Sequence, residues 1–362
     1  MPVMPIMRYA LIGDGESPHL LKWAQALKPR VELWLASSRG VAPPLARLVP
    51  SWRTLALNTH PQHGGDNLAL IKRLPELARW LQTVDADWIN PHYLTSHGTL
   101  AWAAKRGWRL RGQLLGSAWG SDILVTPQRQ AAYRWVTRRV LKACTLATSD
   151  SQHMAGRMHE LGAGEVMVFP FGLDRLPPPP PAKQPWLFYA NRGLEPIYQP
   201  QRVLETFAAV AAHQPLARLV VANDGALREP LQHWVQAHGL AERVQFVGRL
   251  DAEAQSLWYA RAQWFLSLPQ SDSVAVSVLE AMAHGCIPLL SDLPANRELV
   301  DPGRNGWILP EAAPPSQAEL EDLRQRAGDI ARDNRRWVQA HGLFEPAVQR
   351  LLARLQELTP KA

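Results

Sequence analysis

The chain has 362 residues, of which 46% are apolar and 20% are charged. This length exceeds one typical core and suits two α/β domains, and the composition excludes a chain too polar to bury a core. The formal net charge of +7 suits a polyanionic partner, such as nucleic acid, an anionic membrane or a phosphate-bearing substrate.

Targeting and redox signals are sparse. The first residues lack a basic start followed by a long apolar stretch. No run approaches the roughly 18 apolar residues that a membrane span requires. The two cysteines, Cys144 and Cys286, lie far apart in apolar contexts and favour buried thiols over a disulfide. We therefore expect a soluble cytoplasmic protein, or one lying peripherally on the inner face of the membrane.

Apolar runs alternate with helical patterns through the first half of the chain. A strand at 8–12 enters the turn Gly13-Asp14-Gly15, and a helix at 19–27 and a strand at 31–35 follow. Further strands are predicted at 87–90, 113–117, 145–148 and 165–169, and helices at 70–83, 97–106, 128–142 and 151–161. This alternation predicts a doubly wound sheet of parallel strands.

Five consecutive prolines, 177–181, indicate a stiff spacer, and we place the domain boundary there. The alternation then restarts, with strands at 186–190, 218–222, 244–246, 264–267 and 287–290 and helices at 200–213, 227–238, 252–261 and 276–284. A helical stretch at 315–358, interrupted near Gly342, ends the chain. We predict two Rossmann-like α/β domains, at 1–176 and 177–340, facing a central ligand cleft. A helix at 341–362 is expected to pack back towards the first domain.

The strongest functional signal lies at 265–309. A predicted strand ends in a polar loop, and a helix begins directly after it, with the candidate ligand-binding residues Asp272, Ser273, Val276, Ser277 and Glu280. The unpaired N–H groups and the dipole of a helix start favour a diphosphate. Carboxylates on either side suit the hydroxyls of a sugar and a ribose. The run from Ser277 to Glu280 also fits a capping box, in which Glu280 only closes the helix start.

Asp272 and Glu280, followed by Ala-Met-Ala-His-Gly at 281–285, resemble the signature of retaining glycosyltransferase family 4, which has the GT-B fold. The continuation Ser-Asp-Leu-Pro-Ala-Asn-Arg-Glu at 291–298 is similar to one subgroup of that family. The resemblance implies a nucleotide-sugar donor, with Asp272 contacting the donor sugar and Glu280 the nucleotide ribose.

Other segments agree with this resemblance. The segment 169–174 is similar to the family's Pro-Asn-Gly-Val-Asp, and 244–249, which ends in Arg249, resembles the turn near which the nucleotide base binds. Gly13 and Gly15 occupy the place where the family's glycine-rich turn meets the donor phosphates. Taken alone, so short a Gly-x-Gly is read as a simple tight turn.

Arg192 directly follows the first strand of the second domain. Its guanidinium would point into the cleft and could clamp a diphosphate in bidentate fashion; an exposed loop arginine is the alternative. Many family members carry a lysine a few residues later, but 195–198 contains none. The charge at the leaving group would therefore rest on Arg192 and the helix dipole.

The first domain departs from the family pattern at Trp119. Many members place there a histidine that contacts the donor sugar, ahead of the Gly-x-Asp that ends here in Asp122. Trp119 would stack on a sugar or simply pack. His92 ends a strand and could supply an imidazole to the cleft instead, with a structural histidine as the alternative. We interpret His97 as a helix-start residue.

No metal or cofactor is expected. Asp85-Ala86-Asp87 precedes a buried strand, where it does not suggest a metal site. Zinc-ligand spacing, a phosphate loop and a nucleophile elbow do not occur in the sequence.

The first domain is strongly basic and aromatic. Lysines and arginines gather with tyrosine and tryptophan in two segments, at 102–111 and 128–142. We favour an anionic membrane surface over nucleic acid, because no nucleic-acid recognition module accompanies the charge and because acceptors in this family are often lipid-linked. A merely solvated face is the alternative.

Together these patterns predict a retaining, metal-independent hexosyltransferase that acts on a lipid-linked or cell-surface glycan, as in polysaccharide or lipopolysaccharide synthesis. A nucleotide-sugar epimerase of the same fold stays open. A non-catalytic partner subunit also stays open, because Trp119 replaces the family's usual histidine and the family's usual lysine after Arg192 is missing.

Overall fold

The computed structural model describes residues 6–59, 68–311 and 313–360. Its contacts divide the chain into two compact units. The N-terminal unit comprises residues 1–169 and 345–362, and the C-terminal unit comprises residues 170–344. The proline run at 177–181 has no helix or strand and lies in the C-terminal unit.

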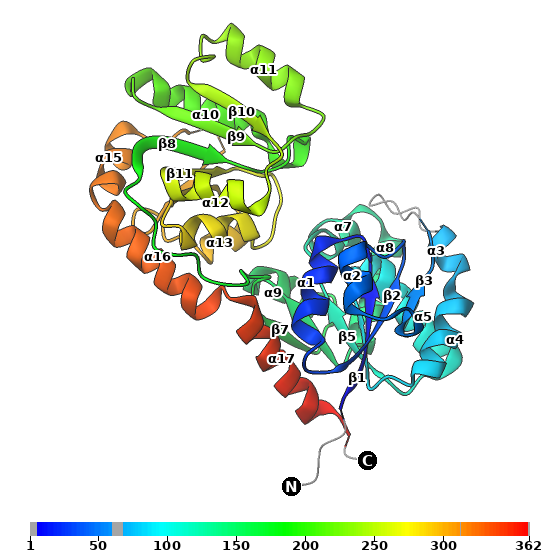
Figure 1. The fold of residues 1–362 in the computed structure, drawn as a ribbon. Coiled ribbons are helices and arrows are strands. Elements are labelled where there is room, and N and C mark those ends of the chain that lie inside the picture. The colour runs from blue at the N-terminus through cyan, green and yellow to red at the C-terminus, as the bar shows by residue number, and fades with distance from the viewer. Residues whose placement is uncertain (1–5, 60–67, 312, 361–362) are drawn as a thin grey trace. The chain divides into compact units, whose positions relative to one another are not determined.

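The N-terminal unit is built on a parallel sheet of seven strands in the order β3-β2-β1-β4-β5-β6-β7 (Figure 1). Their bounds are β1 (Arg8–Gly13), β2 (Glu32–Ser37), β3 (Thr54–Ala56), β4 (Trp88–Pro91), β5 (Gln113–Ser117), β6 (Leu146–Ser149) and β7 (Glu165–Val168). Strand β3 was not predicted, because it has three half-buried residues at the sheet edge. The strand order reverses between β1 and β4, and such switch points are where this architecture binds ligands.

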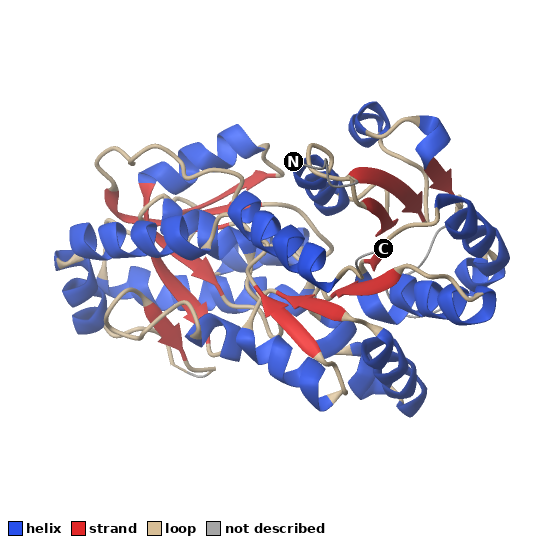
Figure 2. Ribbon diagram, turned by 90° about the horizontal axis from the view of Figure 1, so that it is seen from below, coloured by secondary structure: helices blue, strands red, loops and turns tan. Residues whose placement is uncertain are grey.

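Helices flank the strands of this sheet (Figure 2). They are α1 (Pro18–Leu27), α2 (Pro43–Leu48), η1 (Ser51–Arg53), α3 (Leu68–Lys72), α4 (Leu74–Val84), η2 (Tyr93–Gly98), α5 (Thr99–Trp108), α6 (Ser121–Leu124), α7 (Thr126–Arg129), α8 (Ala131–Ala143) and α9 (Gln152–Glu160). Two predicted helices are each divided, one at Arg73 and one at Gln130, whose backbone is extended. The π-helix η2 precedes α5, so His97 lies inside a helical segment, and its interpretation as a helix-start residue is wrong.

The last helix, α17 (Phe344–Leu358), contributes side chains to the N-terminal unit. Its residues Val348, Leu351 and Leu355 are fully buried. Beyond its end, Thr359 Oγ1 accepts a hydrogen bond of 2.9 Å from Trp88 Nε1 on β4. These contacts make the end of the chain part of the core that the beginning of the chain builds.

The C-terminal unit has a second parallel sheet, of six strands in the order β10-β9-β8-β11-β12-β13. Its strands are β8 (Gln184–Ala190), β9 (Arg218–Ala222), β10 (Val244–Gly248), β11 (Ala262–Ser267), β12 (Ile287–Ser291) and β13 (Trp307–Leu309). Phe188, Trp264 and Phe265 are fully buried at its centre, as expected for strands covered on both faces. Here the order reverses between β8 and β11, so the loops that follow these two strands lie together at one edge.

The helices of this unit are η3 (Pro196–Tyr198), α10 (Pro200–His213), α11 (Arg228–Ala237), α12 (Ala252–Arg261), α13 (Val276–Ala283), α14 (Pro294–Arg297), α15 (Gln317–Gln325) and α16 (Ala327–His341). The four helices predicted before the tail are present in this unit, whereas the short helices η3 and α14 and the edge strand β13 were not predicted. The predicted tail helix is interrupted at Arg326 as well as near Gly342. A capping box of Ser316 and Glu319 starts α15.

Candidate active site

Arg192 lies just beyond the end of β8, at the centre of the C-terminal sheet. Its guanidinium is 2.6 Å from Asp272 Oδ2 and donates to Ser277 Oγ at 3.2 Å. The guanidinium carbon also lies 4.5 Å from the centre of the Tyr198 ring, a cation–π contact. The Arg192 side chain is 18% exposed, so it is held in place yet reachable from outside. It is therefore not the freely exposed loop arginine that the sequence left as an alternative.

A small apolar cavity lies beneath Arg192, lined among others by Leu194 and Tyr198. Its volume of about 10 Å³ admits one water-sized sphere. A sugar or a nucleotide does not fit there, so a ligand of Arg192 would approach from the solvent side.

Asp272 lies in the loop between β11 and α13. Burial raises the pKa of its carboxyl, while Arg192 and the Ser273 backbone N–H, which donates at 3.0 Å, both oppose that rise. Ser273 is itself buried. The loop therefore offers a partly buried carboxylate that a cation and a backbone donor keep in a defined position.

Helix α13 starts at Val276 and is capped by Ala275, which has no side chain able to accept a hydrogen bond. The capping box considered for Ser277 and Glu280 is therefore wrong, because both residues lie inside the helix. Glu280 Oε2 instead lies 3.0 Å from the hydroxyl of Tyr259 on α12. The helix start thus keeps its partial positive charge beside Arg192.

Sequence reasoning missed Tyr259 and the side chain of Asn191. Asn191 Nδ2 donates to Tyr259 Oη at 2.7 Å and to Gln255 Oε1 at 2.7 Å. A tyrosine in a helix packed on a buried strand needs a partner for its hydroxyl. That requirement is the one signal in the sequence that could have drawn attention to Tyr259.

Arg249 lies apart from this group. It follows β10, the outermost strand of the sheet, and its side chain is exposed. The pKa of Asp224 is lowered chiefly by the Gly225 backbone N–H and then by Arg228, and the charge of Arg249 makes a smaller contribution. Of the predicted residues in this unit, Arg192, Asp272, Ser273, Val276, Ser277 and Glu280 come together at one edge, and Arg249 lies two strands away from β8.

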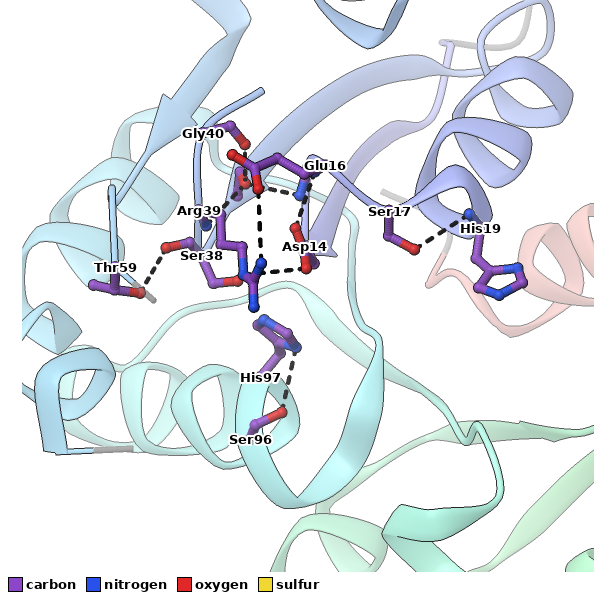
Figure 3. Close-up of polar contacts among 12 residues, drawn as sticks. Asp14, Glu16, Ser17, His19, Ser38, Arg39, Gly40, Thr59, Ser96 and His97 are labelled. Atoms are coloured by element: carbon purple, nitrogen blue, oxygen red, sulfur yellow. Dashed lines mark hydrogen bonds and ion pairs between the residues drawn. The ribbon is translucent and has the colours of Figure 1, made fainter. Parts of the chain in front are cut away.

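In the N-terminal unit, polar contacts surround the glycine-rich turn, among them those of Asp14, Glu16 and Arg39 (Figure 3). The Gly15 N–H donates to Ser37 Oγ at 2.8 Å, and a Cβ at Gly15 would lie 2.6 Å from the Gly40 carbonyl oxygen. A Cβ at Gly13 would lie 2.6 Å from Leu20. Gly15 is thus required for close packing against the backbone, which supports the tight-turn interpretation there, whereas the neighbour of Gly13 is the flexible end of a side chain.

The charges beside this turn also disfavour a diphosphate. Arg39 pairs with Asp14 at 3.4 Å and with Glu16 at 3.7 Å, so two carboxylates surround one guanidinium. The His97 ring points towards that guanidinium (Figure 3). Its Nδ1–H donates to the His92 carbonyl oxygen at 2.7 Å. Such a group of carboxylates, a guanidinium and a neutral imidazole is suited to hydroxyl groups rather than to phosphate.

His92 is buried at the end of β4, with 2% of its surface exposed. Its Nε2 lies 3.1 Å from Asn90 Oδ1, and its ring lies 5.2 Å from Trp23 and 5.4 Å from Trp119. Burial, with smaller contributions from His97 and His19, lowers its pKa to about 3. His92 is therefore neutral at physiological pH and acts as a hydrogen-bonding group rather than as a cation.

Asp122 is 1% exposed, and each of its carboxylate oxygens accepts a backbone hydrogen bond. The donors are the N–H groups of Leu94 at 2.7 Å and Trp119 at 2.9 Å. Gly120, which directly follows Trp119, has φ 104°, a backbone conformation that favours glycine. Asp122 thus fixes the turn that carries Trp119, with both of its carboxylate oxygens engaged by backbone N–H groups. Trp119 stacks on Tyr93 at 5.7 Å.

The part of the chain that the structure describes contains no helix long and apolar enough to cross a membrane. Within the same ranges, no three His, Cys, Asp or Glu side chains are grouped so as to hold a metal ion.

Both units match known protein families. Residues 174–326 match the family model described as glycosyl transferases group 1, and residues 8–151 match the one described as glycosyl transferase 4-like. The chain thus combines a domain of the glycosyl transferases group 1 family with a glycosyl transferase 4-like domain.

Related proteins agree with this identification. The chain is 32% identical to an alpha-monoglucosyldiacylglycerol synthase of Streptococcus pneumoniae over 85 residues, which is 24% of this chain and only 19% of that relative's length. It is 24% identical to D-inositol 3-phosphate glycosyltransferase 2 of Catenulispora acidiphila, over 77% of this chain and 73% of that protein. Among solved structures, HepE of Anabaena in complex with UDP matches with a TM-score of 0.75 at 16% identity, over 97% of this chain and 100% of HepE. The predicted GT-B fold, with two Rossmann-like domains, is confirmed.

The buried imidazole of His92 makes a prediction about acid stability. In the unfolded chain the histidine has an ordinary pKa of about 6.5. Below that pH the unfolded state therefore binds a proton at His92, whereas in the folded state His92 stays neutral. The stability present above pH 6.5 is then lost as the pH falls. From pH 7 to pH 5, His92 alone should lower the free energy of unfolding by about 2 kcal/mol. His92→Gln should remove that part of the loss, as measured by urea unfolding at each pH.

The matched control is His159→Gln, which replaces an exposed histidine of the same unit on α9. It should leave the pH dependence as in the wild type. Equal pH slopes for the wild type and His92→Gln would show that His92 takes up a proton in the folded protein.

Proposed function

We propose that this glycosyltransferase moves a sugar from a nucleotide-diphosphate donor to a carbohydrate acceptor, with retention of the anomeric configuration. The observation that carries the proposal is the joining of Arg192, Asp272 and Ser277 at the start of α13. A guanidinium, a carboxylate and a helix N-terminus in one place can bind a diphosphate and the sugar attached to it.

The names of related proteins support this class of donor. HepE of Anabaena was solved with UDP and with UDP-glucose. A relative from Mycolicibacterium smegmatis, 30% identical over 138 residues, is named GDP-mannose-dependent alpha-mannosyltransferase. These proteins differ in nucleotide and in sugar, and both donors are nucleotide-diphosphate sugars.

In the proposed donor complex, Arg192 and the start of α13 hold the diphosphate. Val276, Ser277 and Ser273 line that start, Asp272 accepts hydrogen bonds from the donor sugar, and Glu280 accepts them from the ribose. Arg249 lies on the side of the nucleotide base. The Arg192–Asp272 pair keeps both groups preorganised before the donor arrives.

The reaction breaks the bond between the anomeric carbon of the sugar and the diphosphate oxygen. The acceptor hydroxyl oxygen bonds to that carbon from the same face, and its proton passes to the departing diphosphate. Negative charge that builds on the diphosphate is stabilised by Arg192 and the helix dipole. In the N-terminal unit, neutral His92 offers a hydrogen bond, while Asp122 positions the turn of Trp119.

The two alternatives have less support. An epimerase of this fold needs acid and base groups in the N-terminal unit, but His92 is buried with a pKa of about 3, and both oxygens of Asp122 are engaged by backbone N–H groups. A non-catalytic partner subunit would not need Arg192, Asp272 and Ser277 to be kept in contact.

We further propose a lipid-linked or cell-surface glycan acceptor, reached at an anionic membrane surface. Residues 88–149 hold nine lysines and arginines against a single acidic residue, Asp122, so this segment carries more positive charge than the net +7 of the whole chain. The surface of α8 concentrates it, with the exposed residues Arg134, Trp135, Arg138, Arg139 and Lys142.

Trp135 suits an interface between water and lipid. It is 54% exposed and packs edge-on against Trp102 of α5 at 6.4 Å. The Arg139 guanidinium carbon lies 5.2 Å from its ring centre. A half-exposed tryptophan among unneutralised arginines is typical of surfaces that lie on anionic lipid.

Arg192→Ala should lower kcat by roughly 10²–10³ and raise the donor KM less, because the contact strengthens as charge builds on the leaving diphosphate. Arg192→Lys should recover only part of the loss, since an ammonium cannot reproduce the fork geometry. The measurement is steady-state release of nucleoside diphosphate, with circular dichroism to verify folding.

Arg324→Ala is the matched control, because it breaks a bidentate arginine–glutamate pair with Glu321 on α15, away from the site. It should keep the wild-type kcat. A near wild-type kcat for Arg192→Ala would mean that the leaving group is stabilised elsewhere.

The reaction should retain configuration without a divalent metal, because Arg192 and the helix start supply the positive charge. Turnover in EDTA should equal turnover without it, and NMR of the product should show the anomeric configuration of the donor. Activity that is lost in EDTA and restored by manganese or magnesium, or an inverted product, contradicts this mechanism.

The enzyme should sediment with phosphatidylglycerol vesicles and not with phosphatidylcholine vesicles. Each basic residue near an anionic surface contributes about 1 kcal/mol. Combining Arg138→Ala with Arg139→Ala should therefore weaken vesicle binding about thirtyfold, and transfer to a lipid-borne acceptor should fall with it while nucleotide binding is unchanged.

Combining Arg332→Ala with Arg336→Ala on α16 removes the same charge from the C-terminal unit and should leave vesicle binding as in the wild type. Equal binding to neutral and anionic vesicles, or no effect of the α8 substitutions, would exclude α8 as the lipid-binding surface.

A further inference from the structure

A buried phenol connects the two segments that form the donor site. Tyr259 lies on α12, with 1% of its surface exposed. We propose that Tyr259 is a positioning residue, whose hydroxyl sets both the Glu280 carboxylate and the turn that carries Arg192 for binding of the nucleotide diphosphate. This inference rests on the function proposed above and adds to it a residue that no ligand touches.

The first half of the connection runs to α13. Tyr259 Oη lies 3.0 Å from Glu280 Oε2 and 3.1 Å from the Ser277 carbonyl oxygen. A phenol has one proton to donate, and a carboxylate acceptor gives the stronger, charge-assisted bond. The pKa of the phenol is raised by burial first and then by the charge of Glu280, so it keeps that proton.

The second half runs to the end of β8. Tyr259 Oη accepts a hydrogen bond of 2.7 Å from Asn191 Nδ2, and Asn191 directly precedes Arg192. The same nitrogen donates its other proton to Gln255 Oε1 at 2.7 Å. Both protons of this amide are thus used on α12, which fixes the residue next to Arg192 relative to the helix whose Tyr259 contacts Glu280.

The core in turn fixes the ring of Tyr259. It stacks on His284 at 5.3 Å with an interplanar angle of 19°, and it meets Tyr189 edge-on at 5.0 Å. The His284 ring is itself held by Ser256 Oγ at 2.9 Å and by the Glu280 carbonyl oxygen at 2.8 Å. Because this packing prevents the ring from moving, the hydroxyl is a rigid reference point for both segments.

Tyr259→Phe keeps the packing of the ring and removes only the hydroxyl. Glu280 then loses a fixed donor, and Asn191 loses an acceptor. Hydrogen bonds to charged groups are strong enough that we expect nucleotide affinity to fall roughly tenfold or more. Because the hydroxyl acts in part through Glu280, part of that effect should depend on the Glu280 carboxylate.

A double-mutant cycle tests this dependence. UDP and GDP are titrated calorimetrically into the full-length protein, and the tighter nucleotide is used for Tyr259→Phe, Glu280→Gln and the double variant. We expect both single variants to bind more weakly and the double variant to lose less affinity than the sum of the two single losses. A merely structural role predicts additive losses instead.

The matched control is Thr359→Val, which removes the hydrogen-bond partner of Trp88 in the N-terminal unit. It should lower the melting temperature by an amount comparable to Tyr259→Phe and leave nucleotide affinity unchanged. The control therefore separates an effect of lower protein stability on nucleotide affinity from an effect of misplacing Glu280 and Arg192.

The outcomes separate this inference from the proposed function. If Glu280→Gln leaves nucleotide affinity unchanged, the ribose role of Glu280 fails, and the inference fails with it. If Glu280→Gln weakens binding but Tyr259→Phe does not, or the two losses add, only the inference is overturned. Should Tyr259→Phe not fold, Asn191→Ala replaces it in the cycle, and additive losses overturn the inference in the same way.

Discussion

The ion pair between Arg192 and Asp272 is the contact on which the proposed donor site depends. It joins residues 80 positions apart in the sequence, at a distance of 2.6 Å. The two residues meet because β8 and β11 are neighbouring parallel strands, and the loops that follow them leave the sheet at the same edge. Burial alone would raise the pKa of Asp272, and the guanidinium opposes that rise. Charges that would be costly apart are therefore kept together where a ligand can reach them.

The rest of this edge is organised by the need to satisfy buried polar groups. Asn191, Gln255, Tyr259 and Glu280 come from β8, α12 and α13, and each hydrogen bond among them satisfies a group that burial would otherwise penalise. The N-terminal unit uses the same rule differently. There both carboxylate oxygens of Asp122 accept hydrogen bonds from backbone N–H groups, which fixes the conformation of a turn. A carboxylate thus belongs to the proposed ligand site in one unit and holds a backbone turn in the other.

The charge distribution separates the two units in a further way. The C-terminal unit pairs most of its arginines with nearby carboxylates, as at Arg297 and Arg324. The segment 88–149 of the N-terminal unit has almost no acidic residues with which to do so. Its charge is therefore available to an external anion, and Trp135 adds an apolar contact at the same surface. In the proposed function, donor binding and attachment to an anionic surface therefore belong to different units of the chain.

The sequence by itself determined the fold class, the alternation of strands and helices, and the segment that forms the donor site. Those features depend on local periodicity and on a motif that is continuous along the chain. The tertiary structure decided which interpretation of each residue holds. Glu280 fits a capping box by spacing, but the helix starts at Val276, with Ala275 as its N-cap, and places Glu280 against Tyr259 instead. His92 is neutral because of the groups that bury it, and the partners of Asn191 come from another helix. Such contacts depend on distances between segments remote in sequence, which spacing along the chain does not encode.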